Sequence, residues 1–204
     1  MSQHFARRMS TVHRSFIREI LKVTADPEII SFAGGLPHPE LFPVAAMDTA
    51  AHDVFRDIGA SALQYSTTEG DAGLRAIIAG RYKKRGLTVD PDSILVTTGS
   101  QQILDICAKV FMDRDSKVVI ERPGYLGAIQ AFSLFEPEFV TICLEDDGPN
   151  LEELEAAFKD GARCFYAVPN FQNPSGVSYS LEKRKAVAAL ADRYDALFVE
   201  DDPY

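Results

Sequence analysis

From residue 94 onward, short apolar runs alternate with amphipathic stretches, and this alternation restricts the possible folds more than any other feature of the sequence. The extended runs lie at 94–97, 117–120, 139–144, 164–168 and 196–199. The helical stretches between them lie at 103–111, 125–134, 151–159 and 182–194. Strands that alternate with helices of this length are typical of a parallel sheet covered by helices. The sequence therefore predicts an α/β protein with a doubly wound, mostly parallel sheet.

The first ninety residues are mainly helical in pattern. Residues 10–23, 43–55 and 71–85 each carry apolar residues at helical spacing. Gly34 and Gly35 open a loop with two prolines, and adjacent glycines allow the backbone to approach a ligand closely. A plain linker is the alternative interpretation of this loop.

Composition excludes several classes of function. A net charge of −9 argues against a nucleic-acid-binding surface, which needs a basic stripe. No apolar run is long enough to cross a bilayer, so we expect no membrane partner. The three cysteines lie in apolar patterns without metal-ligand spacing, and the histidines have no second ligand type nearby. We therefore expect a cytoplasmic protein without a metal site.

The run at 164–168 ends at a loop that carries a candidate ligand-binding amide. Pro169 cannot donate to a sheet ladder, and Asn173-Pro174-Ser175-Gly176 is turn chemistry. In an open α/β sheet, ligands bind at the carboxyl ends of the strands. The amide of Asn173 is suited to bond a ring substituent. Capping of the turn is the alternative role, since Asn is common before Pro.

Two further strand ends carry residues that suit a planar, phosphorylated ligand. Ser100 and Gln101 follow Gly99 at a predicted helix start, where backbone N–H groups and a hydroxyl make an anion site. A simple Ser N-cap is the alternative. Tyr125 begins the next helix and is placed to stack on a ring, or else to pack on its own helix.

Three carboxylates follow the last run, at Glu200, Asp201 and Asp202. Buried unpaired carboxylates are costly, so this group needs a cation, a metal or a protonated ring nitrogen. Metal binding lacks a histidine partner nearby, and a solvated turn is the remaining alternative. Together, the strand ends supply a phosphate cradle, an aromatic platform, an amide and an acid. Pyridoxal phosphate needs these four groups, because an acid beside its pyridine nitrogen keeps the ring protonated and electron-withdrawing.

In these motifs the sequence resembles the fold-type-I pyridoxal-phosphate aminotransferases of class I/II, especially multi-substrate enzymes of the 2-aminoadipate and kynurenine type. The resemblance runs through the whole chain, and four motifs in the family's order carry it. They are Ser31-Phe32-Ala33-Gly34-Gly35-Leu36-Pro37, Gly99-Ser100-Gln101-Gln102, Asn173-Pro174-Ser175-Gly176 and Glu200-Asp201-Asp202-Pro203-Tyr204. It implies an N-terminal arm and small-domain segment at 1–45 and an incomplete cofactor-binding large domain at 46–204.

The resemblance also implies roles for single residues around the cofactor. Ser100 and Gln101 would hold the phosphate, and Tyr125 would stack on the ring. Asn173 and Tyr204 would bond the ring's phenolic oxygen. Asp201, three residues before Tyr204 in the family's D-x-x-Y spacing, would face the pyridine nitrogen, whereas Asp202 would not.

Three more positions receive roles by the same resemblance. Gly35 would lie against the substrate, and Arg18 would touch a substrate side chain, although a surface arginine is the commoner reason for such a residue. Tyr65 would reach the phosphate bound by the partner subunit, which implies a homodimer with shared sites. The family's Schiff-base lysine lies downstream of position 204, so no catalytic residue is assigned in this chain, and the sequence is expected to be part of a longer enzyme.

The expected reaction is transfer of an amino group from an amino acid to a 2-oxo acid. Three alternatives stay open: the effector domain of a transcription regulator, a pyridoxal-phosphate lyase on the same fold, and a truncated, non-catalytic chain. A regulator would need an N-terminal winged helix-turn-helix module, for which the roughly thirty residues before Ser31 are too few.

Overall fold

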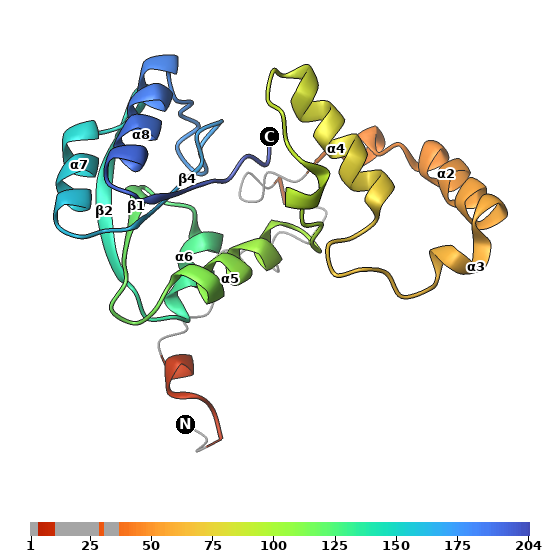
Figure 1. Cartoon of the computed structure of the whole chain (residues 1–204), viewed down its shortest axis with the longest axis horizontal. Coiled ribbons are helices and arrows are strands. Elements are labelled where there is room, and N and C mark those ends of the chain that lie inside the picture. The colour runs from red at the N-terminus through yellow and green to blue at the C-terminus, as the bar shows by residue number, and fades with distance from the viewer. Residues whose placement is uncertain (1–3, 11–28, 31–36) are drawn as a thin grey trace. The chain divides into compact units, whose positions relative to one another are not determined.

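The structure is a computed structural model, and it describes residues 4–10, 29–30 and 37–204 of the chain (Figure 1). The chain forms two compact units, Met1–Val12 with Thr97–Tyr204 and His13–Val96. The predicted division into 1–45 and 46–204 follows the family's small and large domains, and it stays a prediction. The helix predicted over 10–23 lies outside the described residues, apart from the end of a 3-10 helix, η1 (Arg7–Ser10).

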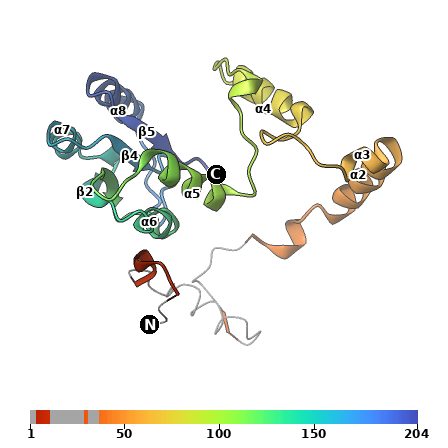
Figure 2. The same cartoon turned by 60° about the horizontal axis from the view of Figure 1, so that its bottom comes forward.

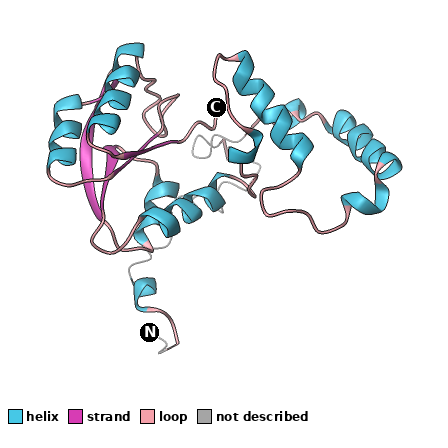
Figure 3. Ribbon diagram, viewed as in Figure 1, coloured by secondary structure: helices cyan, strands magenta, loops and turns pink. Residues whose placement is uncertain are grey.

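A five-stranded, mostly parallel sheet is the centre of the unit that contains Thr97–Tyr204 (Figure 3). Its strands are β1 (Lys117–Arg122), β2 (Glu138–Glu145), β3 (Gly148–Pro149), β4 (Cys164–Ala167) and β5 (Leu197–Glu200). They lie in the order β3-β2-β1-β4-β5, and only β3 runs antiparallel to its neighbour. The predicted mostly parallel sheet is therefore confirmed.

Helices cover both faces of this sheet, as a doubly wound fold requires. On one face lie α5 (Ser100–Phe111) and α6 (Leu126–Ser133), and on the other lie α7 (Leu151–Lys159) and α8 (Leu181–Arg193) (Figure 1). Alternate side chains of a strand point to opposite faces. Accordingly, Val118 and Ile120 join the core beneath α5 and α6, whereas Val119 joins the core beneath α7 and α8. Burial on both faces explains why these strands are continuous apolar runs in the sequence.

Side-chain caps set the starts of the helices on the second face. Asn150 accepts the N–H of Glu153 at 2.9 Å at the start of α7, and Ser180 accepts the N–H of Lys183 at 3.2 Å at the start of α8. Each such cap stabilises a protein by about 1 kcal/mol. The Ser180 cap fixes where the loop between β4 and α8 ends.

The unit that contains His13–Val96 is helical in its described part. Its elements are η2 (Pro39–Leu41), α2 (Val44–Asp57), α3 (Gly59–Ala62), α4 (Ala72–Lys84) and η3 (Pro91–Ser93). The helices predicted at 43–55 and 71–85 are confirmed. None of the helices in the described ranges is long and apolar enough to cross a membrane.

The strand predicted at 94–97 does not form. Ile94 has extended backbone angles, but the N–H of Val96 donates to the carbonyl of Glu69 at 3.0 Å, outside any sheet. Just beyond, the N–H of Thr98 donates to the side chain of Gln102 at 2.6 Å. The prediction was wrong because an apolar extended run becomes a strand only when a neighbouring strand takes up its backbone groups.

Candidate active site

A cavity of about 100 Å³ lies at the carboxyl ends of β4 and β5 and brings most of the predicted site residues together. Its lining consists of Ser100, Tyr125, Val168, Asn173, Asp201, Pro203 and Tyr204. All of these residues belong to the unit with the sheet, and Figure 2 shows the C-terminal end of the chain beside the start of α5. Five of the seven were predicted from the sequence, from four separate segments.

The start of α5 offers backbone N–H groups beside this cavity. Gly99, in the N-cap position, has φ +86°, a value that residues with a side chain rarely adopt, and no side chain caps the helix. The first N–H groups of a helix attract anions through their partial positive charge. Ser100 lines the cavity, whereas the side chain of Gln101 donates to the carbonyl of Gly127 on α6 at 3.3 Å.

Tyr125 stands in the N-cap position of α6 and is half-buried. Its ring fills the space above Gly127, because a Cβ built on that glycine would lie 2.6 Å from ring atoms Cε1 and Cζ. Glycine at 127 therefore lets the ring lie close to the first turn of α6.

Asp201 is held in place by its backbone and by one carboxylate oxygen. Its N–H donates to the carbonyl of Ala167 at 2.9 Å, one residue beyond the end of β5. Its Oδ2 accepts a hydrogen bond of 2.6 Å from the hydroxyl of Tyr166. Burial, then this bond, raises the pKa of Tyr166, so the phenol stays a protonated donor. Within the described part of the chain Oδ1 of Asp201 has no hydrogen bond, and it is free to accept one from a ligand.

The neighbouring carboxylate has a different environment. Oδ1 of Asp202 accepts a hydrogen bond of 2.6 Å from Nδ2 of Asn170, and Oδ1 of Asn170 accepts one of 2.6 Å from Arg184 on α8. Asp202 does not line the cavity. The two acids that the sequence places side by side are therefore separated by their partners.

Asn173 and Tyr204 contribute from two loops. Asn173 is exposed in the turn after β4, where its bond to Pro174 is cis. Tyr204 is also exposed, and its ring meets Phe171 edge to face with the centroids 6.2 Å apart. An amide and a phenol thus reach the cavity from the β4 and β5 ends.

Residues 29–204 match the protein family described as aminotransferase class I and II. The chain belongs to this family. The match covers nearly all of the chain and includes every residue that lines the cavity. The likeness that the four sequence motifs predicted is therefore confirmed.

Individual members of the aminotransferase family, including some with solved structures, are similar to this chain. It is 45% identical to the 2-aminoadipate transaminase of Thermus thermophilus over 100% of the chain and 50% of that protein. The kynurenine aminotransferase of Pyrococcus horikoshii, solved in complex with PMP, superposes with a TM-score of 0.91 and 38% identity over 98% of this chain and 51% of that one. The alpha-aminoadipate aminotransferase of Thermus thermophilus, solved with N-(5'-phosphopyridoxyl)-L-leucine, superposes with a TM-score of 0.85 and 44% identity. That superposition covers 98% of this chain and 49% of the other. The chain spans about half the length of the proteins that it matches.

The buried residues whose hydrogen bonds fix the site's side chains and loops were not identified from the sequence. Tyr166 was read only as part of an apolar strand, although a phenol in a fully buried run needs a polar partner. Glu121 and Gln172, both buried, received no role either. A charged residue directly after Val118, Val119 and Ile120 was the signal available for Glu121.

Three predicted site residues lie apart from this description. Tyr65 is 98% exposed and belongs to the unit with His13–Val96. Gly35 and Arg18 lie outside the described residues. Their assignments stay predictions, as do the cofactor-binding roles of the residues around the cavity.

Proposed function

We propose that this chain binds pyridoxal 5'-phosphate and serves an enzyme that moves an amino group from an amino acid to a 2-oxo acid. The observation that carries the proposal is the carboxylate of Asp201, fixed by Tyr166 and lining one cavity with Tyr125 and Asn173. Family membership supports it, as do the pyridoxyl compounds in the two related crystal structures.

The donors and acceptors around the cavity fit this cofactor in kind. The uncapped start of α5 with Ser100 suits a phosphate, and Tyr125 offers a ring face. Asn173 and Tyr204 offer an amide and a phenol to the ring's phenolic oxygen. Tyr125, Asn173 and Tyr204 follow β1, β4 and β5, so the sheet sets the spacing of these three, whereas Ser100 lies at the start of α5 after an extended run that is not a strand.

Asp201 has the central chemical role in this proposal. When bound, pyridoxal phosphate supplies a ring that withdraws electrons from the substrate's α-carbon, and it does so best when its pyridine nitrogen is protonated. Asp201 would hold that proton on the nitrogen through its carboxylate, of which Tyr166 occupies Oδ2 and leaves Oδ1 without a hydrogen bond among the described residues. Because the phenol stays protonated, it can only donate to this carboxylate and does not compete for the proton.

The assembly belongs to the proposal as well. We propose a cytoplasmic homodimer in which Tyr65 reaches the phosphate of the partner subunit, with Gly35 and Arg18 at the substrate. The 98% exposure of Tyr65 leaves its ring available to a second copy. Amino acids and 2-oxo acids would be the substrates, as the names of the related enzymes indicate.

The test uses the protein purified at its natural length and follows a labelled amino group from one amino acid to another. The protein, pyridoxal phosphate, an amino acid with isotope-labelled nitrogen and an unlabelled 2-oxo acid are mixed, and the new amino acid is analysed by mass spectrometry. We expect the label in the new amino acid. Asp201→Asn should slow the transfer by about tenfold or more, since a hydrogen bond to a charged group contributes about 1.5–3 kcal/mol. Asp202→Asn, the matched control, should leave the rate close to that of the unchanged protein.

Other results would point to the alternatives. Release of labelled ammonia or carbon–carbon cleavage without transfer would indicate a lyase. Cofactor binding without turnover would indicate a regulator domain or a non-catalytic chain. Equal effects of the two Asp→Asn changes would contradict the role given to Asp201.

A further inference from the structure

Two buried polar side chains lie just behind the candidate site. Glu121 is 2% exposed and Gln172 is 1% exposed, and among the described residues they are the only buried polar or charged ones apart from tyrosines. Burial of a carboxylate or an amide is costly unless hydrogen bonds compensate for the lost water. What these two side chains bond is therefore informative about why they are there.

Glu121, on β1, joins its strand to both ends of the loop that carries Asn173. Its Oε2 accepts the N–H of Val168 at 3.2 Å, at the point where β4 ends and the cavity begins. Its Oε1 accepts the hydroxyl of Tyr179 at 2.6 Å, and the N–H of Tyr179 returns to the carbonyl of Pro169 at 2.9 Å. One carboxylate thus closes the base of the loop.

Gln172 joins the same loop to the segment that leads to Tyr125. Its Nε2 donates to the carbonyl of Pro123 at 2.8 Å. Its Oε1 accepts both the N–H of Ser175 at 2.8 Å and the hydroxyl of Ser175 at 2.6 Å. Pro123 lies two residues before Tyr125, and Gln172 and Ser175 lie on either side of Asn173 in the chain.

We infer that Glu121 and Gln172 are positioning residues, which together fix the amide of Asn173 relative to the ring of Tyr125. We call this pair the brace. Neither residue lines the cavity, so the brace acts through the two loops that it joins and not by touching a ligand. The expected effect of the brace on cofactor binding rests on the proposed function. Its effect on the position of the Asn173 loop does not.

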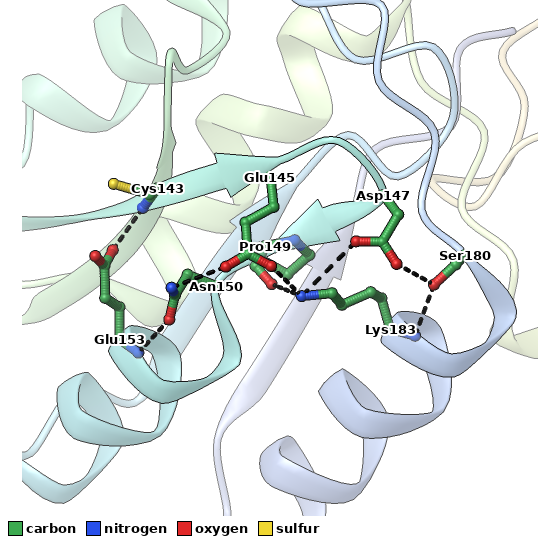
Figure 4. A network of polar contacts seen from close by, with 8 residues as sticks. All are labelled: Cys143, Glu145, Asp147, Pro149, Asn150, Glu153, Ser180 and Lys183. Carbon is green, nitrogen blue, oxygen red and sulfur yellow. Dashed lines mark hydrogen bonds and ion pairs between the residues drawn. The ribbon is translucent and has the colours of Figure 1, made fainter.

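Ser180, which directly follows Tyr179 in the chain, supplies a matched control. Ser180 faces away from the brace: its hydroxyl donates to Asp147 at 2.9 Å, and the same oxygen caps α8 (Figure 4). The surrounding network ties Lys183 to Glu145 at 2.5 Å and to the carbonyl of Pro149 at 2.9 Å. Ser180→Ala should therefore weaken the fold near the loop without changing the hydrogen bonds of Glu121 and Gln172.

The first measurement is hydrogen exchange of the backbone amides in the cofactor-free protein. Gln172→Leu, which removes the side-chain hydrogen bonds of Gln172 at similar size, should speed exchange across residues 173–177 by about tenfold. Ser180→Ala should leave exchange there within about twofold while still lowering the unfolding midpoint in urea. Equal exchange in the two variants would overturn the brace.

The second measurement is the dissociation constant of pyridoxal phosphate, obtained by fluorescence titration. Gln172→Leu should raise it by about tenfold and Ser180→Ala by less than about twofold. In an Asn173→Ala background, part of the effect of Gln172→Leu should disappear, because the brace acts partly through that amide. Full additivity of the two changes would overturn the proposed route.

Two further variants keep the test decisive. Glu121→Gln retains an acceptor for Val168 and a donor for Tyr179, so its affinity should stay near the original value, whereas Glu121→Leu should behave as Gln172→Leu does. If Gln172→Leu does not fold, Ser175→Ala removes the hydroxyl that donates to Gln172 at 2.6 Å, and it should speed exchange and weaken affinity in the same direction by a smaller factor. If the unchanged protein fails to bind the cofactor, the proposed function fails, while the exchange result still decides the brace.

Discussion

The hydroxyl of Tyr166, on β4, donates a hydrogen bond of 2.6 Å to Oδ2 of Asp201, just past the end of β5. The ring of Tyr166 is buried and meets Phe132 of α6 edge to face, with the centroids 5.4 Å apart. The core beneath α5 and α6 therefore fixes the phenol, and the phenol fixes the acid. Adjacent parallel strands here place the donor on one strand and the acceptor beyond the end of the next.

Tyr166→Phe tests this relationship directly. Loss of the hydroxyl lets the carboxylate of Asp201 turn, and we expect the dissociation constant for pyridoxal phosphate to rise by about tenfold or more, in line with about 1.5–3 kcal/mol for a hydrogen bond to a charged group. Fluorescence titration measures it. Tyr194→Phe is the matched control, because it removes a phenol that donates at 2.8 Å to Glu155, away from the cavity. Comparable losses of affinity in both variants would show that Tyr166 has no special part in the site.

Gly127→Ala should separate the stability of the protein from its affinity for the cofactor. Alanine in a helix is favoured over glycine by about 1 kcal/mol, but its Cβ would lie 2.6 Å from the ring of Tyr125 and must displace it. We expect unchanged or higher stability in urea and a several-fold weaker binding of pyridoxal phosphate. The control is Gly80→Ala in α4, where an added Cβ meets nothing within 4 Å. Unchanged affinity in Gly127→Ala would mean that the ring position is not important.

Asn150→Ala should lower the stability of the protein and leave its affinity for the cofactor unchanged, the reverse of what we expect for Gly127→Ala. This residue caps α7 and also donates from Nδ2 to Glu145 at 2.9 Å (Figure 4). Loss of a cap costs about 0.5–2 kcal/mol, so the free energy of unfolding should fall by that amount. Cofactor affinity should not change, because the cap lies outside the cavity lining. Asn150→Ser, which keeps a capping oxygen without placing a second negative charge beside Glu145, should restore most of the stability.

The sequence predicted the sheet well because both of its faces are covered. Continuous apolar runs such as Cys164–Ala167 have no other stable place than a buried strand, and the helices between them are long enough to show their period. The two-residue strand β3 was missed because two residues carry no periodicity. The run at 94–97 was misread because pairing depends on partners that a local pattern does not contain.

The residues that line the cavity could be predicted from the sequence, but the buried residues that hold them in place could not. Ser100, Tyr125, Asn173, Asp201 and Tyr204 stand out because each combines an unusual side chain with a strand end or a helix start. Tyr166 and Gln172 do not, because their roles come from hydrogen bonds to residues 35 and 49 positions away. Long-range contacts of this kind follow from the register of the strands and are not visible in a local motif.

The pH dependence of stability offers a test of the buried carboxylate itself. Burial raises the pKa of Glu121 above its ordinary value, although the hydrogen bonds from Tyr179, Val168 and Gln172 oppose the shift. As the pH rises from the ordinary pKa to the raised one, the unfolded chain loses this proton first, so the native state binds more protons and loses stability. Glu121→Gln does not titrate there. The free energy of unfolding of the unchanged protein minus that of Glu121→Gln should therefore fall as the pH rises from the ordinary glutamate pKa of about 4.3 into the range of the raised one, by no more than about 1.4 kcal/mol per unit. Urea denaturation across this range measures it. Tyr179→Phe removes a donor that favours the charged form, so the fall should extend to higher pH in that variant, and a difference independent of pH would contradict the raised pKa.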